Sequence, residues 1–336
     1  MNFRGKKYLI RALIAIIALL ILNLSIYFQN RSEPNILKVY FLDVGQGDSI
    51  LIETPNGTQT MIDAGPNNKV INELSEVIPF FDRTVDIIIP THSDLDHIAG
   101  FPEILRRFNV KNYYDSGFVD NDDLNTEIKL LVQNEKGINI GKISRGDKIV
   151  LDKEHNISLE ILWPPANYET KENNNRSIVA RLDYGETSFL FTGDAGIDVE
   201  KILLENSTMR NSSTTEIIDS TSTKNNSENI LDVDILKAGH HGSKTASNLE
   251  FLEKVTPELT IISAGKDNKF GHPNQEALDN INKVGSKTKN TAEVGRILIK
   301  SDGVNYWIEE ENFSQKLFDQ TSFFKSFVSS ILVNGS

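Results

Sequence analysis

Cysteine is absent from the 336-residue sequence. Disulfides and thiolate metal sites are therefore excluded, and any bound metal must be held by histidine, carboxylate, amide or water ligands. Histidine is also scarce, with six residues in the chain. Candidate metal ligands are thus confined to a few positions.

An excess of positive charge is missing as well, since the formal net charge is −12. This charge argues against a protein that binds polyanions through its whole surface, although a local basic groove is compatible with it. Internal repeats are not evident. The length allows one large domain or two small ones, and a hydrophobic content of 39% is ordinary for a globular protein.

Long hydrophobic runs are lacking except near the N-terminus, where residues 12–28 are apolar apart from Asn23 and Ser25. This run is about 17 residues long, the lower limit for crossing a bilayer. Four basic residues between positions 4 and 11 precede it, which predicts the N-terminus inside and the rest of the chain outside. We therefore predict a single-pass membrane anchor and linker over residues 1–34. A cleaved signal peptide, which would make the protein secreted, is the alternative, although "NLSIYFQN" offers no A-x-A-like cleavage site.

Residues 35–310 show short strand patterns that alternate with helical ones, which predicts layered sheets covered by helices. "ILKVYFLDVG" and "VDIIIPT" indicate strands, and Asn56-Gly57 predicts a hairpin turn. Residues 206–230 are rich in Ser, Thr and Asn and predict a disordered surface insertion. In the tail, residues 311–336, several Phe residues have near-helical spacing. We expect the tail to pack on the domain, with a membrane surface as the alternative.

The stretch "THSDLDHIAG", residues 91–100, follows one of these buried strands. Side chains at alternate positions of a loop that leaves a sheet can point one way, as His92 and Asp94 would. The adjacent Asp96 and His97 can then face a second centre. The spacing predicts two neighbouring metal ions, whereas a solvated acidic turn is the alternative.

Two later motifs also place ligand-type side chains at strand ends. Asp194 stands in "FTGDAG", and His240 and His241 stand in "LKAGHHGSKTAS". Three imidazoles and three carboxylates would give two divalent ions a nearly neutral site with room for a bridging hydroxide, which suits phosphodiester hydrolysis. His272, in "KFGHPN", could reach a phosphate or donate a proton, whereas His155 is expected to be solvated.

These motifs, in this order, resemble the metallo-β-lactamase superfamily, and in particular the metallo-β-lactamase-like domain of ComEC-type competence proteins. The resemblance covers roughly residues 37–308 and includes "FLDVGQGDSILIETPNGTQTMIDAG", "NNRSIVARL" and "ISAGKDNKFGHPN". It implies an α/β fold, the αββα four-layer sandwich, with a dinuclear site at one edge between the sheets.

The resemblance also implies residue roles. His92 and Asp94 would bind the first metal, Asp96 and His97 the second, and Asp194 would bridge them. One histidine of "HHGS" would complete the second site. We favour His240 because it comes first after the strand, and leave His241 as the open alternative. The predicted metal ligands are thus His92, Asp94, Asp96, His97, Asp194 and His240, the predicted catalytic residues are Asp96, His241 and His272, and Asp48 and Asp63 are expected to support the site from behind.

Two positions depart from the general superfamily pattern. Asp94 replaces a histidine, and the histidine expected before Asp194 is missing. In its place is "NNRS", where Asn175 or Ser177 would approach the first metal. An oxygen-rich first site shifts preference from zinc toward manganese, so the predicted cofactors are two divalent ions, Zn²⁺ or Mn²⁺.

The resemblance does not extend to DNA transport, because a full ComEC-type protein carries a multi-span channel. We therefore predict a metal-dependent phosphodiesterase, with DNA among its candidate substrates, exposed outside the cell membrane and held there by the N-terminal helix. No protein partner is evident. A cell-surface phosphocholine-type esterase and a non-catalytic binding protein on the same fold are the alternatives.

Overall fold

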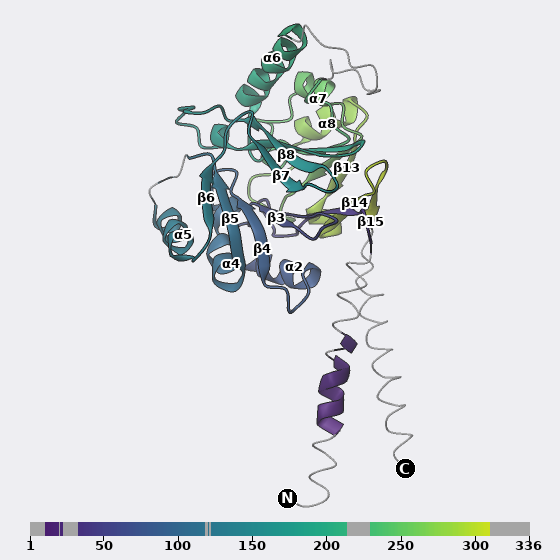
Figure 1. The fold of residues 1–336 in the computed structure, drawn as a ribbon. Helices are drawn as coiled ribbons and strands as arrows, with labels where there is room; N and C mark the ends of the chain where they lie inside the picture. Colours follow the sequence, from purple (N-terminus) through teal and green to yellow (C-terminus); the bar gives the residue numbers. More distant parts are fainter. Residues whose placement is uncertain are drawn as a thin grey trace, which may run out of the picture.

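Two β-sheets face each other and carry helices on their outer sides (Figure 1). The structure is a computed structural model that describes residues 11–19, 21–22, 33–117, 120, 122–213 and 229–309. Within these residues one sheet has eight strands and the other has seven. The predicted αββα sandwich is confirmed.

Neighbouring strands pair antiparallel at one end of each sheet and parallel at the other. The first sheet runs, in spatial order, β15 (Tyr306–Glu309), β14 (Ile297–Ser301), β1 (Leu37–Phe41), β2 (Ile50–Glu53), β3 (Gln59–Ile62), β4 (Thr84–Ile89), β5 (Asn109–Asp115) and β6 (Asn139–Lys142). The second runs β13 (Lys287–Asn290), β12 (Leu259–Ile262), β11 (Ile235–Lys237), β10 (Thr187–Phe191), β9 (Val179–Tyr184), β8 (Ile157–Trp163) and β7 (Lys148–Asp152). The predicted hairpin at Asn56-Gly57 joins β2 and β3.

Strand β1 shows how the sequence builds the layers. Leu37, Val39 and Phe41 point into the core between the sheets, whereas Tyr40 and Leu42 pack with the helices outside the first sheet. Because successive strand residues face opposite sides, a strand apolar on both faces must be covered on both.

Helices supply the outer covers, each through one apolar face. Outside the first sheet lie α2 (Lys69–Val77), α3 (Leu95–Ile98), α4 (Phe101–Arg107) and α5 (Asp123–Asn134), and outside the second lie α6 (Ile197–Ser213), α7 (Leu249–Val255) and α8 (Gln275–Lys283). Short connections are made by α9 (Thr291–Val294) and by two 3₁₀ turns, η1 (Asn174–Arg176) and η2 (Gly239–Gly242).

The segment predicted to be disordered, residues 206–230, is partly helical. Helix α6 continues through Ser213, so the expectation is wrong for residues 206–213. Val199 and Leu203 hold the first turns of α6 in the outer core, and the helix continues from there into the Ser/Asn-rich stretch. Residues 214–228 lie outside the described part.

The chain's flanks are described only in part. Residues 11–19 and 21–22 are helical, whereas residue 20 and residues 23–28 of the predicted span lie outside the described residues. Across the residues that are described we find no helix with the length and apolar character needed to cross a membrane. The predicted tail, residues 311–336, also lies outside them.

Candidate metal centre

Four strands end at the same edge of the sandwich, and each is followed by a site motif. Asp48 follows β1, and His92 to His97 follow β4 in the first sheet. Asp194 follows β10, and His240 and His241 follow β11 in the second sheet. Residues about 190 positions apart in sequence therefore meet between the two sheets.

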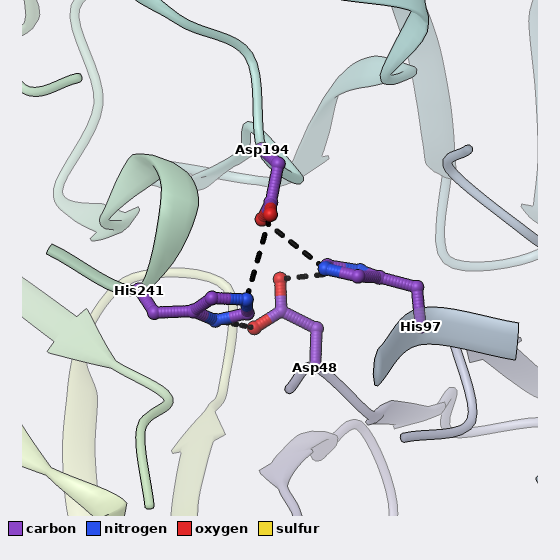
Figure 2. Close-up of side chains that lie close together, drawn as sticks. All are labelled: Asp48, His97, Asp194 and His241. Carbon is purple, nitrogen blue, oxygen red and sulfur yellow. Dashed lines mark ion pairs between the residues drawn. The ribbon is translucent and has the colours of Figure 1, made fainter. Parts of the chain in front are cut away.

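The Nε2 atoms of three histidines converge on Asp194. His97 Nε2 lies 3.2 Å from Asp194 Oδ1, and His241 Nε2 lies 3.5 Å from Asp194 Oδ2 (Figure 2). His92 Nε2 lies 4.0 Å from Asp194 Oδ2. All three Nε2 atoms and Asp194 Oδ1 are buried without a hydrogen-bond partner. Buried polar atoms are normally satisfied, so this cluster has the character of a ligand set.

The other three predicted ligands lie beside this cluster, more exposed to solvent. Asp96 Oδ2 is 3.3 Å from His241 Nε2, and Asp94 Oδ2 is 3.4 Å from His92 Nε2. His240 Nε2 is 3.7 Å from Asp194 Oδ2. The structure thus brings all six predicted ligands together, and it brings His241 into the same group.

The Nδ1 atoms of His97 and His241 each contact an oxygen atom that holds the ring in place. His97 Nδ1 lies 2.7 Å from Asp63 Oδ2, a carboxylate that also accepts hydrogen bonds from the backbone and hydroxyl of Thr91. His241 Nδ1 lies 2.9 Å from the carbonyl oxygen of Ser263. Partners at Nδ1 set the tautomer and the ring orientation, so that Nε2 is presented to the cluster.

Asp48 lies on the Nδ1 side of the same rings, as Figure 2 shows. Its carboxylate is 3.3 Å from His241 Nδ1 and 3.9 Å from His97 Nδ1. It also pairs with Lys237, a fully buried lysine whose ammonium donates to the carbonyl of Gly193. Sequence reasoning missed Lys237. Its signal was a lone charge at the end of the apolar strand "ILK".

These contacts define a group that could hold a metal ion: Asp48, His97, Asp194 and His241 are all buried, and their ligand atoms lie within 4.8 Å of one another. The separations also suit a metal. Ligand atoms about 2.1 Å from a tetrahedral ion are about 3.4 Å from each other. The distances of 3.2–3.5 Å from His97 and His241 to Asp194, and from His241 to Asp96, match this spacing.

The two adjacent histidines take up different positions because of the backbone between them. Both have left-handed φ values, 47° for His240 and 56° for His241. Such a conformation costs non-glycine residues roughly 1–2 kcal/mol each. It directs His241 inward, with 1% of its side chain exposed, and leaves 26% of the His240 side chain exposed.

The solvent-facing rim of the cluster carries polar side chains. The amide of Asn173 donates to Asp94 Oδ1, and Asn174 contacts the His240 ring. The His272 ring lies 5.5 Å from that of His240 and 6.3 Å from that of His241. Of the two residues expected near the first metal, Ser177 accepts a hydrogen bond from the Asp194 amide through its hydroxyl.

Opposite charges within the cluster offset the effect of burial on the pKa values of its carboxylates and imidazoles. Burial acts to raise the pKa of Asp194, but His241 and His97 outweigh it and hold that pKa well below its usual value. Burial acts to lower the pKa of His241, yet Asp194 and Asp48 raise it to about 9. Burial and the nearby histidines lower the pKa of His272. Since ligand histidines must be neutral, metal binding here would displace protons.

His155 does not belong to the site, but it is not simply solvated. Its Nδ1 lies 2.8 Å from Asp152 Oδ2, and its Nε2 lies 2.9 Å from Asn35 Oδ1. It therefore connects the residues before β1 to the turn between β7 and β8, and the expectation of a free surface histidine is wrong.

An αββα sandwich with a cluster of histidines and aspartates at one edge is typical of metal-dependent hydrolases. The chain belongs to the metallo-beta-lactamase superfamily, whose family model matches residues 42–266. The resemblance noted from the motifs is thereby confirmed.

The curated relatives include proteins named for competence and for recombination. The chain is 29% identical to ComE operon protein 3 of Bacillus subtilis over 278 residues, which cover 77% of this chain and 32% of that protein. It is 27% identical to Recombination protein 2 of Haemophilus influenzae, covering 81% of this chain and 30% of that protein. The chain spans about a third of the length of the curated relatives it matches.

Among solved structures, the metallo-beta-lactamase fold protein YhfI from Bacillus subtilis is 11% identical to this chain, with a TM-score of 0.45. The match covers 76% of this chain and 95% of YhfI.

Proposed function

We propose that this protein is a metal-dependent phosphodiesterase that uses two divalent ions, Zn²⁺ or Mn²⁺, and acts outside the cell membrane. The observation that carries the proposal is the convergence of three buried, unpartnered Nε2 atoms on the Asp194 carboxylate. Both oxygens of Asp194 face histidines: Oδ1 lies near His97, and Oδ2 lies near His92 and His241.

Two contacts support one division of the ligands, that of His241 with Asp96 and that of His92 with Asp94. His97, His241 and Asp96 would hold the second ion with Asp194, because His241 lies within 3.5 Å of both carboxylates. His92 and Asp94 would hold the first ion with Asp194. Asp48 lies on the Nδ1 side and is paired with Lys237, so we assign it to orienting the imidazoles. His241 thus takes the ligand position that the sequence had given to His240.

Bound divalent ions supply a hydroxide nucleophile at neutral pH and neutralise charge that develops on phosphate oxygens. The chain's own residues do the rest. Asp63 and the Ser263 carbonyl hold the histidine rings in place. His240 and His272, on the exposed rim, would contact the phosphate and donate a proton toward the leaving group.

The substrate is proposed to be a phosphodiester because two ions and three carboxylates leave a site of nearly neutral charge, which accepts a singly charged diester. Relatives named for competence and recombination favour DNA among the candidates. The net charge of −12 favours a smaller ester, such as a phosphocholine diester, as the second candidate.

Membrane attachment through the N-terminal segment is supported by the described residues there. Leu13, Ile14, Ile16, Ile17 and Ile21 each expose between 46% and 63% of their surface. A helix this apolar and this exposed is typical of a lipid environment. The basic residues before it favour a catalytic domain outside the membrane.

A substrate panel tests the proposal. The full-length chain, stripped of metal and reloaded with Mn²⁺ or Zn²⁺, is assayed on single-stranded DNA, double-stranded DNA and a choline phosphodiester. We expect metal-dependent turnover of at least one, with steep salt inhibition if the substrate is DNA. Full metal loading without turnover of any diester would instead support a non-catalytic binding protein.

A further inference from the structure

We infer that the sheet edge opposite the metal centre is a membrane-docking face, where Phe80 and Phe81 insert into the bilayer interface. The inference rests on the proposed membrane attachment. It adds a second contact with the lipid and a fixed orientation of the metal centre.

Two adjacent phenylalanines lie at the tip of the loop between α2 and β4. Phe80 is 77% exposed and Phe81 is 43% exposed. Single apolar side chains on a surface are common, but two large aromatic neighbours at a loop tip are a costly arrangement in water. The Arg83 guanidinium lies 5.2 Å from the Phe80 ring centroid, so a basic group accompanies the pair.

The strand directions place this loop on the edge where the N-terminal segment joins the domain. Strand β1 is antiparallel to β2, β2 is antiparallel to β3, and β3 is parallel to β4. Strands β1 and β4 therefore run the same way, and the residues before each lie at the same edge. In Figure 1 the α2–β4 loop and the helical residues 11–19 and 21–22 lie on the same side of the body.

A second exposed apolar group lies at this edge. Leu37 pairs with Ser301, so the turn after β14 lies beside the start of β1. Val304 in that turn is 63% exposed, and Trp307 on β15 is 39% exposed. Aromatic side chains at the membrane–water interface are typical of proteins that contact lipid.

Charge indicates how this face would bind. Asp82 lies beside Arg83 in the loop, and Glu33, which precedes β1 at the same edge, pairs with Lys38 and Lys300. The edge is therefore not a basic patch that would depend on anionic lipids. We expect docking by apolar insertion, which works on zwitterionic lipid as well.

Docking would hold the metal centre away from the bilayer. Asp48 and His92 follow β1 and β4, whereas residue 33 and Phe81 precede these strands. A strand of six residues separates the two edges by about 20 Å. Substrate would then reach the centre from the aqueous side and not from within the lipid.

The absence of cysteine allows a direct test by nitroxide labelling of single-cysteine variants. Full-length Phe80→Cys, Val304→Cys and Ile16→Cys are reconstituted in phosphatidylcholine vesicles. Phe270→Cys, which is 56% exposed beside His272 at the metal centre, and Leu130→Cys, which is 53% exposed on α5, are matched controls. Collision of each label with oxygen and with a water-soluble nickel chelate reports lipid or water contact.

We expect the labels at Ile16, Phe80 and Val304 to favour oxygen and the two controls to favour nickel. Replacing Phe80 and Phe81 by serine should return the Val304 label to the aqueous pattern. An aqueous Phe80 label with a lipid-facing Ile16 label would overturn docking but not attachment. A Phe80 label shielded from both agents would indicate a protein contact and would also overturn it. An aqueous Ile16 label would refute attachment and docking together, and metal-dependent activity, measured separately, would be unaffected.

Discussion

His240 and His241 are neighbours in sequence with opposite surroundings. His241 is buried among Asp48, Asp96 and Asp194, which raise its pKa to about 9, whereas burial lowers the pKa of the partly exposed His240. Residue type alone could not separate them. The left-handed backbone at both positions turns the second ring inward.

Removal of each ring should therefore have a different effect. In His241→Ala, bound metal should fall from two ions to one per chain, and turnover should fall by more than the roughly 10–100-fold typical of losing an outer partner. His240→Ala should keep both ions and raise KM. Metal analysis with steady-state kinetics distinguishes the two, and the reverse pattern would show that His240 is the ligand.

At the scale of elements, the site depends on how closely its loops approach. Gly47, in the loop after β1, has φ +134°, and a Cβ there would lie 2.1 Å from the Asp96 carbonyl oxygen. Gly45, two residues earlier, has φ +88° and nothing within 4 Å of its Cβ position. The two glycines share a backbone requirement and differ in the space around them.

Alanine substitutions at Gly45 and Gly47 distinguish the cost of the positive φ from the effect of the close contact with Asp96. Both Gly45→Ala and Gly47→Ala should lose about 1–2 kcal/mol of unfolding free energy from the positive φ. Gly47→Ala alone should also displace Asp96 and weaken metal binding, by about 10-fold or more. Calorimetric metal titration gives the comparison, and equal affinities in the two variants would contradict it.

Helix α6 is joined to the loop after η2 by a buried carboxylate. Glu200, 3% exposed, accepts hydrogen bonds from the amides of Ser247 and Asn248. Burial raises the pKa of Glu200 to about 7, although these two amides act to lower it. The folded chain therefore binds this proton more tightly than the unfolded chain does.

This shift gives a pH dependence with a defined sign. Between pH 4.5, the ordinary pKa, and about 7, the folded state holds more protons at Glu200, so its contribution to unfolding free energy falls as pH rises. The stability of the parent relative to Glu200→Gln should be greater at pH 5 than at pH 8, by up to about 3 kcal/mol. Denaturant unfolding at the two pH values measures this. A difference independent of pH would show that Glu200 is not a proton-binding group in this range.

For the whole molecule, local patterns in the sequence predicted layered sheets and ligand-type residues at strand ends, whereas the αββα sandwich was implied by the family resemblance. Buried strands followed by His and Asp motifs meet at one edge once the sheets form, as those before His97, Asp194 and His241 do. Lys237 and Ser263 could not be assigned in this way, since their roles follow from packing between distant strands. The extension of α6 was missed because Ser and Asn favour turns when their local sequence is considered alone.

The two opposite edges of the sandwich carry different features. One edge carries the ligand cluster, and the other joins the N-terminal segment and exposes Phe80 and Phe81. In the proposed arrangement, chemistry and attachment are separated by the length of a strand, so changes at the docking edge should leave metal binding intact.

The most direct test of metal-dependent phosphodiester hydrolysis is turnover of an aryl phosphodiester by the full-length chain and by His97→Ala, each stripped of metal and reloaded with Mn²⁺ or Zn²⁺. His97 faces Asp194 at Nε2 and Asp63 at Nδ1, so its loss removes a central ligand. We predict no turnover without metal, restored turnover in the reloaded parent, and none in His97→Ala. Equal turnover by the parent and His97→Ala would contradict a metal centre at this edge.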